Sequence, residues 1–164
     1  MNVKRDPASA AWPVFLRAHA EIVAAVEQRL HDADLPSLIW YDVLWALEQA
    51  PDRTLRMSTL ADAVMLSRSN LSHIVTRLEA QKLVIRRKSA DDGRGAVATL
   101  TDKGAALRLA MWPTYRDAVA TAFTQHLKRD DARALDAILR RLLASRRRPE
   151  SAGVSPASAR SAKT

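Results

Sequence analysis

The stretch DDGRGAVATLT, Asp91 to Thr101, places two carboxylates, one guanidinium group and two glycines in a short loop. A basic run of Arg86, Arg87 and Lys88 precedes this loop, so positive charge lies beside it. Residues of these types can hold a phosphate, bind a metal ion, form a solvated turn or contact nucleic acid. The elements around the loop decide between these four possibilities.

A nucleotide site and a metal site both fit this loop poorly. Phosphate-binding loops follow a strand and open a helix, with the spacing GxxxxGK[ST] or GxGxxG. Gly93 and Gly95 lie instead between two β-compatible runs, with no third glycine and no following lysine. A divalent-metal loop needs more oxygen ligands than Asp91 and Asp92 supply. The pattern therefore favours a turn or a nucleic-acid contact.

The rest of the sequence offers little catalytic chemistry. It has no cysteine, which excludes disulfides, thiolate nucleophiles and thiolate metal sites. His19, His31, His73 and His126 show no i, i+4 pair of histidines and no HxxxE or HExxH spacing. Because the sequence shows no nucleophile–base pair, metal cluster or cofactor loop, we expect no cofactor and rank an enzyme last among the functions considered.

The elements that position the loop follow from hydrophobic periodicity and from helix-end signals. The expected helices cover residues 13–30, 38–47, 58–64, 67–81 and 101–127, with a last helix from about residue 130, and the expected strands cover 83–88 and 96–100. Pro13 suits the first turn of the first helix, and Pro113 should kink or break the long one. The stretch APDRTLRM before the third helix is expected to be a loop.

The segment LADAVMLSRSNLSHI has the apolar spacing of a helix–turn–helix, in which two short helices pack across a tight turn. The contacts expected across that turn come from Leu60, Ala61, Val64, Leu66, Leu71 and Ile74. Met65 stands in the turn, where glycine is frequent, and Ser67 is a good cap for the second helix.

The second helix of this motif has one apolar stripe and one polar face. Small polar residues line that face and basic residues flank it: Ser69, Ser72, His73 and Thr76, with Arg68 and Arg77. Short polar groups can reach base edges in a major groove, while guanidinium groups bind phosphates. An ordinary solvated face is the alternative, but such faces are usually rich in Glu and Lys, and no acid lies between Ser67 and Thr76.

A basic hairpin directly after a helix–turn–helix predicts a winged helix. Arg94 at the tip is expected to enter the minor groove beside the one being read. Arg86, Arg87 and Lys88 are expected to contact phosphates, and Asp92 to pair with Arg94 or with backbone amides and so fix the tip.

With these residues the chain resembles the MarR (multiple antibiotic resistance regulator) family of winged-helix transcription regulators. DGRGAVATLT matches the family's wing signature, D-x-R-x-x-x-x-x-L-T, through Asp92, Arg94, Leu100 and Thr101. The segment LRMSTLADAVMLSRSNLSHIVTRLEAQKLVIRR is similar to its helix–turn–helix, and the element order agrees from about residue 10 to 145. The resemblance implies a homodimer that binds pseudo-palindromic promoter DNA, usually as a repressor released by a small ligand.

The expected fold is all-α with a small β-hairpin wing, a winged helix–turn–helix with dimerisation helices at both ends. Residues 1–9 are expected to be a flexible N-terminus, 10–148 the domain and 149–164 a disordered tail; within the domain, about 10–32 and 101–147 dimerise and about 36–100 bind DNA. Apolar residues on the first and last helices, among them Leu135, Ile138 and Leu142, are more than a thin core can cover. Pairing of two chains would bury them, and packing within one chain is the weaker alternative.

An effector site is harder to place from the sequence. In the resembled family a pocket lies where the dimerisation helices meet the winged helix, and aromatic acids or phenols often occupy it. Candidate residues for such a small aromatic or phenolic effector are Trp12, Arg17, His19, Trp40, Trp45, Trp112 and Tyr115. Packing in the core is the favoured interpretation for each, and Trp40 and His19 can serve both purposes.

Charge and hydropathy add two further expectations. The net charge is +8, but the segment from Arg146 onward holds five basic residues and one acid, so half of the excess lies in the tail. No apolar run approaches the roughly 20 residues needed to cross a bilayer, and no secretion signal is visible, so we expect a cytoplasmic protein without a membrane partner. A winged-helix module that binds protein is the alternative function, but it predicts an acidic or apolar face where Ser69–Arg77 lie.

Overall fold

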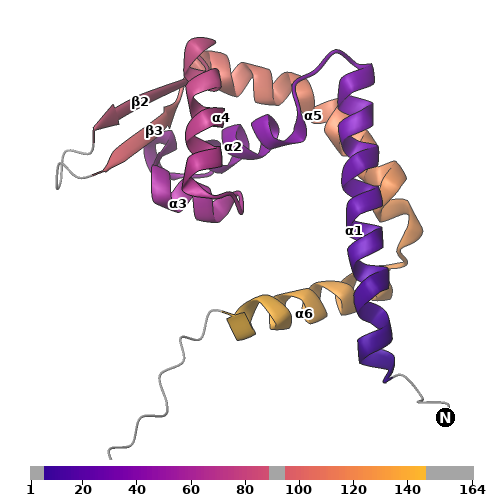
Figure 1. Cartoon of the computed structure of the whole chain (residues 1–164). Coiled ribbons are helices and arrows are strands. Elements are labelled where there is room, and N and C mark those ends of the chain that lie inside the picture. Colours follow the sequence, from indigo (N-terminus) through magenta and orange to yellow (C-terminus); the bar gives the residue numbers. More distant parts are fainter. Residues whose placement is uncertain (1–5, 89–94, 147–164) are drawn as a thin grey trace, which may run out of the picture. The chain divides into compact units, whose positions relative to one another are not determined.

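The computed structural model describes residues 6–88 and 95–146, and Figure 1 shows the order of their elements. The chain divides into two compact units, one up to Gln125 and one from His126 onward. The elements are α1 (Pro7–Asp32), α2 (Leu38–Glu48), the 3₁₀ turn η1 (Pro51–Arg53), β1 (Thr54–Arg56), α3 (Met57–Ala63), α4 (Arg68–Ala80), β2 (Val84–Lys88), β3 (Ala96–Leu100), α5 (Asp102–Ala122), the 3₁₀ turn η2 (Thr124–His126) and α6 (Arg129–Arg146). The predicted winged-helix fold, mostly helical with a small antiparallel sheet, is confirmed.

The first helix begins earlier than predicted. The side chain of Asp6 accepts a hydrogen bond from the backbone N–H of Ser9 at 3.3 Å, and Pro7 occupies the first turn. Pro13 therefore lies inside α1 rather than at its start, and residues 7–9 belong to the helix instead of a flexible N-terminus. This part of α1 is exposed, so water can bind the carbonyl that Pro13 leaves without a partner. Residues 1–5 and the tail expected at 149–164 lie outside the described residues.

The long helix α5 ends at Ala122, five residues before the predicted end, and a 3₁₀ turn follows it. Pro113 lies within α5 without breaking it, and the helix bends along its course in Figure 1. The last helix agrees with its prediction: Asp130 and Asp131 stand in the first turn of α6, where carboxylates are favourable.

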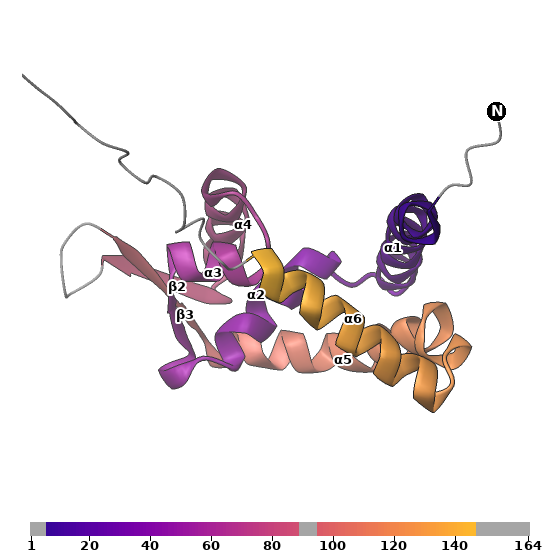
Figure 2. The same ribbon diagram turned by 90° about the horizontal axis from the view of Figure 1, so that it is seen from below.

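The sheet has one strand more than predicted. Its order is β1-β3-β2, with both pairs antiparallel. The β2–β3 hairpin has the predicted position, from Val84 opposite Leu100 to Lys88 opposite Ala96, and it extends away from α3 and α4 (Figure 2). The expected loop APDRTLRM instead contributes β1, which covers the other edge of β3, and the hydroxyls of Thr54 and Thr99 lie 2.8 Å apart across this pair.

Two apolar clusters hold the first unit together. The larger one joins α2, α3, α4 and the sheet, and its fully buried members are Val43, Leu44, Leu47, Leu60, Leu71, Val75, Leu78 and Ala98. The smaller one lies where α1, α2 and α5 meet and contains Val26, Leu30, Tyr41, Met111 and Ala118. Burial of a Leu or Val side chain contributes about 1.5–3 kcal/mol. Among the described helices, none is long and apolar enough to span a membrane.

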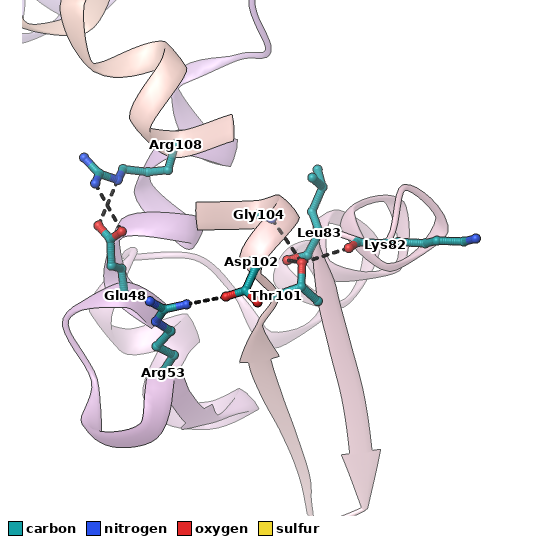
Figure 3. A network of polar contacts seen from close by, with 8 residues as sticks. All are labelled: Glu48, Arg53, Lys82, Leu83, Thr101, Asp102, Gly104 and Arg108. Atoms are coloured by element: carbon teal, nitrogen blue, oxygen red, sulfur yellow. Dashed lines mark hydrogen bonds and ion pairs between the residues drawn. The ribbon is translucent and has the colours of Figure 1, made fainter. Parts of the chain in front are cut away.

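A tight junction ties the wing to the start of α5 (Figure 3). The Thr101 side chain accepts the N–H of Gly104 at 3.0 Å, and its hydroxyl lies 2.9 Å from the carbonyl oxygen of Lys82 and 3.0 Å from that of Leu83. Gly104 is buried against this turn, and a Cβ there would lie 2.2 Å from the Leu83 carbonyl oxygen. Helix α5 can therefore approach the base of the hairpin this closely only because residue 104 has no side chain.

Candidate nucleic-acid interface

The helix–turn–helix predicted from the sequence is present as α3 and α4. The side chain of Ser67 accepts the backbone N–H of Asn70 at 3.2 Å, which confirms Ser67 as the cap of α4. Met65 in the turn has φ of 54°, in the left-handed region that favours glycine. Met65 is 87% exposed, so no packing contact explains a methionine at this position.

Helix α4 separates an apolar face from a polar one. Leu71, Val75 and Leu78 are completely buried and fix the helix against the core. Ser69, His73 and Thr76 are exposed on the opposite face, and Ser72 is half-buried at its margin. The hydroxyl of Thr76 donates to the carbonyl of Ser72 at 2.9 Å, so the free capacity of this oxygen is as an acceptor.

Asn70 is a polar residue of α4 that sequence reasoning left out. It is exposed, and at 100° per residue it shares an edge of the helix with Arg77, two turns further along. A carboxamide can donate to and accept from an adenine edge at the same time. Helical spacing was enough to include Asn70 among the candidates, since only its backbone N–H is used by the Ser67 cap.

The two arginines that flank the polar face differ in their surroundings. Arg68 is exposed in the first turn of α4. The guanidinium carbon of Arg77 lies 5.6 Å from the centroid of the Trp40 ring, a cation–π contact that holds the charge at the edge of the helix. Trp40 itself is 5% exposed and belongs to the larger core cluster, as the core interpretation predicted.

The basic residues of β2 also divide into two kinds. Arg87 and Lys88 are exposed near the end of the described part of the hairpin. Arg86 is partly covered and forms an ion pair with Glu79 of α4, with Nη2 3.5 Å from Oε2. The charge of Arg86 is therefore shared with an acid of the protein. Asp92 and Arg94, the predicted residues of the wing tip, lie outside the described residues.

The seven effector candidates do not come together in one place. Trp12, Phe15 and His19 form a row of rings along α1, with centroids 6.2 and 6.5 Å apart, and Arg17 pairs with Glu21 at 2.7 Å. Tyr115 of α5 stacks on Tyr41 at 4.2 Å, and Trp112 lies 5.9 Å from Tyr115.

Core packing, the interpretation favoured for each candidate, is wrong within the protomer for three of the four tryptophans and also for Arg17 and His19, which are exposed. Trp12 is 60% exposed, and Trp45 and Trp112 are exposed as well. A hollow of about 290 Å³ between α1 and α5 is lined by Arg29, Asp32, Ala33, Pro113, Thr114 and Asp117, and by no effector candidate.

A carboxylate pair near the two stacked tyrosines was not predicted. Glu27 of α1 accepts the backbone N–H of Leu38 with both carboxylate oxygens at 3.1 Å, so it caps the start of α2 from another helix. Burial, and then the nearby charge of Glu27, raise the pKa of Asp42 to about 6. Burial also raises the pKa of Tyr115, with Asp42 as a further cause. Within the ranges 6–88 and 95–146, no group of three or more His, Asp or Glu side chains could hold a metal ion.

Comparison with known proteins gives a consistent result. A sequence model of the MarR family matches residues 33–95. The crystal structure of AbsC, a MarR family transcriptional regulator from Streptomyces coelicolor, is similar with 30% sequence identity and a TM-score of 0.79 over 90% of this chain and 99% of that one. Sco3205 from the same organism, a MarR family transcriptional regulator crystallised in complex with DNA, is 31% identical with a TM-score of 0.79 over 94% of this chain and 97% of that one.

A third structure extends the same likeness. Sco5413, another MarR family transcriptional regulator from Streptomyces coelicolor, is 25% identical, with a TM-score of 0.69 over 85% of this chain and 95% of that one. No curated protein sequence gives a significant match.

Proposed function

This chain belongs to the MarR family of transcriptional regulators, and from that premise we propose that it is a homodimeric repressor that binds a pseudo-palindromic promoter site and leaves it when a small effector binds. The family consists of DNA-binding regulators rather than enzymes.

The observation that carries the proposal is the exposed face of α4. Ser69, His73 and Thr76 point away from the buried stripe of the helix, with Asn70 and the two arginines at its margins. Such a face presents short donors and acceptors to base edges and guanidinium groups to phosphates. Arg87 and Lys88 on β2 add exposed positive charge to the same winged helix.

Exposed apolar residues on both terminal helices support a homodimer. Trp12, Val14, Phe15 and Leu16 form an apolar region on α1 with no cover in the first unit. In the second unit, Ile138, Leu142 and Leu143 are exposed on α6. Pairing of two chains through these helices removes this surface from water. A symmetric dimer then presents two α4 helices to successive major grooves, about 34–36 Å apart.

Two observations support a small effector: the chain belongs to this family, and aromatic side chains remain exposed on the protomer. Trp12 with His19, and Trp112 with Tyr115, offer flat apolar faces and polar edges of the kind that bind aromatic acids or phenols. We infer repression because a dimer bound across a promoter blocks access to it, and a cytoplasmic location because a regulator must reach its DNA.

Selection of bound duplexes from a random library, followed by footprinting, tests the proposal. We expect a selected site with two related half-sites one helical turn apart. Binding should also weaken steeply as salt rises, with a logarithmic slope of about −0.9 for each phosphate neutralised. A winged-helix module that binds protein predicts no selected sequence and a nearly flat salt response. Sedimentation of the free protein at micromolar concentration gives the oligomeric state independently.

A further inference from the structure

Glu79 connects helix α4 to strand β2 of the wing. Its Oε1 accepts the backbone N–H of Arg86 at 3.2 Å, and its Oε2 lies 3.5 Å from Nη2 of the same residue. Strand β2 is an edge of the sheet, so this N–H has no neighbouring strand to bind it. One carboxylate in the last turn of α4 thus contacts both the main chain and the side chain of one residue of β2.

The turn between α4 and β2 is short, and Glu79 contributes to it with its main chain as well as with its side chain. The N–H of Lys82 donates to the backbone carbonyl of Glu79 at 2.8 Å, and the N–H of Leu83 donates to that of Leu78 at 3.0 Å. Lys82 has φ of 62°, so the chain reverses within this turn. The backbone bonds fix where β2 starts, and the carboxylate holds the strand two residues further out.

An acid at this position is unfavourable for DNA binding by itself. Glu79 is the one acidic residue among the thirteen residues of α4, and its side chain is 37% exposed. A carboxylate on a surface that approaches phosphates repels them. The structure accounts for this acid by its two contacts with Arg86 rather than by contact with a duplex.

We propose that Glu79 is a positioning residue for sequence recognition: it holds the wing at a fixed angle to α4, so that both can contact one duplex. The inference rests on the proposed DNA-binding function of α4 and of the hairpin. Without the carboxylate, Arg86 loses an acceptor for its N–H and a partner for its guanidinium, and the hairpin can move relative to the helix.

A role through charge and a role in positioning predict different effects of Glu79→Ala on the ratio of specific to non-specific affinity, and this makes the inference testable. If Glu79 acts only through its charge, Glu79→Ala should strengthen binding to selected and to scrambled duplexes by the same factor. If Glu79 positions the wing, Glu79→Ala should lower the ratio of specific to non-specific affinity by about tenfold, the usual effect of losing a hydrogen bond to a charged group. Glu79→Gln keeps an acceptor for the N–H, so its ratio should lie between those of the parent and Glu79→Ala.

Asp62→Ala is a matched control, because Asp62 is an exposed acid on the neighbouring helix α3. It should strengthen both kinds of binding equally. Amide hydrogen exchange in the DNA-free dimer reads the contact directly, and the Arg86 amide should exchange at least about tenfold faster in Glu79→Ala. If Glu79→Ala keeps the parent's specificity ratio, or leaves that exchange rate unchanged, the inference is overturned while the proposed function stands. If the parent selects no duplex, the proposed function fails and this inference fails with it.

Discussion

Replacing Gly104 with alanine should destabilise the protein, although the same change in most helices has the opposite effect. The added Cβ would lie 2.2 Å from the carbonyl oxygen of Leu83 and 2.7 Å from Cδ1 of Leu100. Ordinary contacts at these atoms are about 3.5 Å or longer. The carbonyl of Leu83 therefore has to move by about 1 Å, and it cannot do so freely because it accepts the N–H of Thr101 at 3.1 Å.

The expected loss follows from these contacts. Overpacking of a buried site costs about 1–3 kcal/mol, and a weakened buried hydrogen bond costs about 1 kcal/mol more. We therefore expect Gly104→Ala to lower the free energy of unfolding by about 2–4 kcal/mol. A free helical position would instead gain up to about 1 kcal/mol from the same change. The two expectations differ in sign, so the measurement decides between them.

Urea unfolding at a fixed protein concentration is the appropriate assay, since the dimer that we propose would make stability depend on concentration. Ala106→Gly, at an exposed position two residues further along α5, is a matched control for helix propensity. It should cost no more than about 1 kcal/mol. The close approach of α5 to the Leu83 carbonyl would be refuted if Gly104→Ala unfolded at the parent's urea concentration or above it.

Three further predictions concern the turn between α3 and α4, helix α4 itself, and the carboxylate pair of Glu27 and Asp42. Met65→Gly should raise the free energy of unfolding by about 0.5–1 kcal/mol, because glycine adopts φ of 54° without strain, whereas Met65→Ala should give no such gain; urea midpoints of the two variants check this. Asn70→Ala should cost about 1–3 kcal/mol in binding to the selected duplex and relax base preference at one position of each half-site, and an unchanged preference across a panel of mutated sites would exclude Asn70 as a reader. Asp42 has a pKa raised from 3.8 to about 6 in the folded chain, so folding stability should fall as pH rises from about 4 to about 6 and stay low above that range. In Asp42→Asn that decline should be absent. Thermal unfolding of both proteins between pH 4 and pH 8 checks this, and parallel curves of stability against pH would count against the carboxylate pair.

The elements that were predicted well carry strong local signals. Ser67 as a cap and the stripe of Leu71, Val75 and Leu78 were enough to place α4 within one residue at each end. The hairpin followed from two β-compatible runs on either side of a glycine-containing loop. In both cases the residues that determine the element are neighbours in the sequence.

The features that were missed depend on residues far apart in the sequence. Strand β1 is three residues long, too short to show alternation, and it forms because β3 has an open edge more than forty residues later. Glu27 of α1 caps helix α2 at Leu38, eleven residues further along the chain. The close approach of Gly104 to Leu83 joins α5 to the end of the turn that follows α4. The scattered effector candidates have the same cause, since spacing along one helix says nothing about which other helix it faces. The predicted start of α1 was wrong for a local reason, because Pro7 and Pro13 are both suited to the first turn of a helix.

The central claim is that the exposed face of α4 reads bases in a major groove, and base-analogue substitution tests it most directly. Replacing single purines of the selected duplex with their 7-deaza analogues removes the N7 acceptor from the major groove and leaves the minor groove unchanged. We expect two or three positions in each half-site to lose about tenfold or more in affinity, and Asn70→Ala or His73→Ala to abolish the loss at one of them. Equal binding of every 7-deaza duplex would contradict the account.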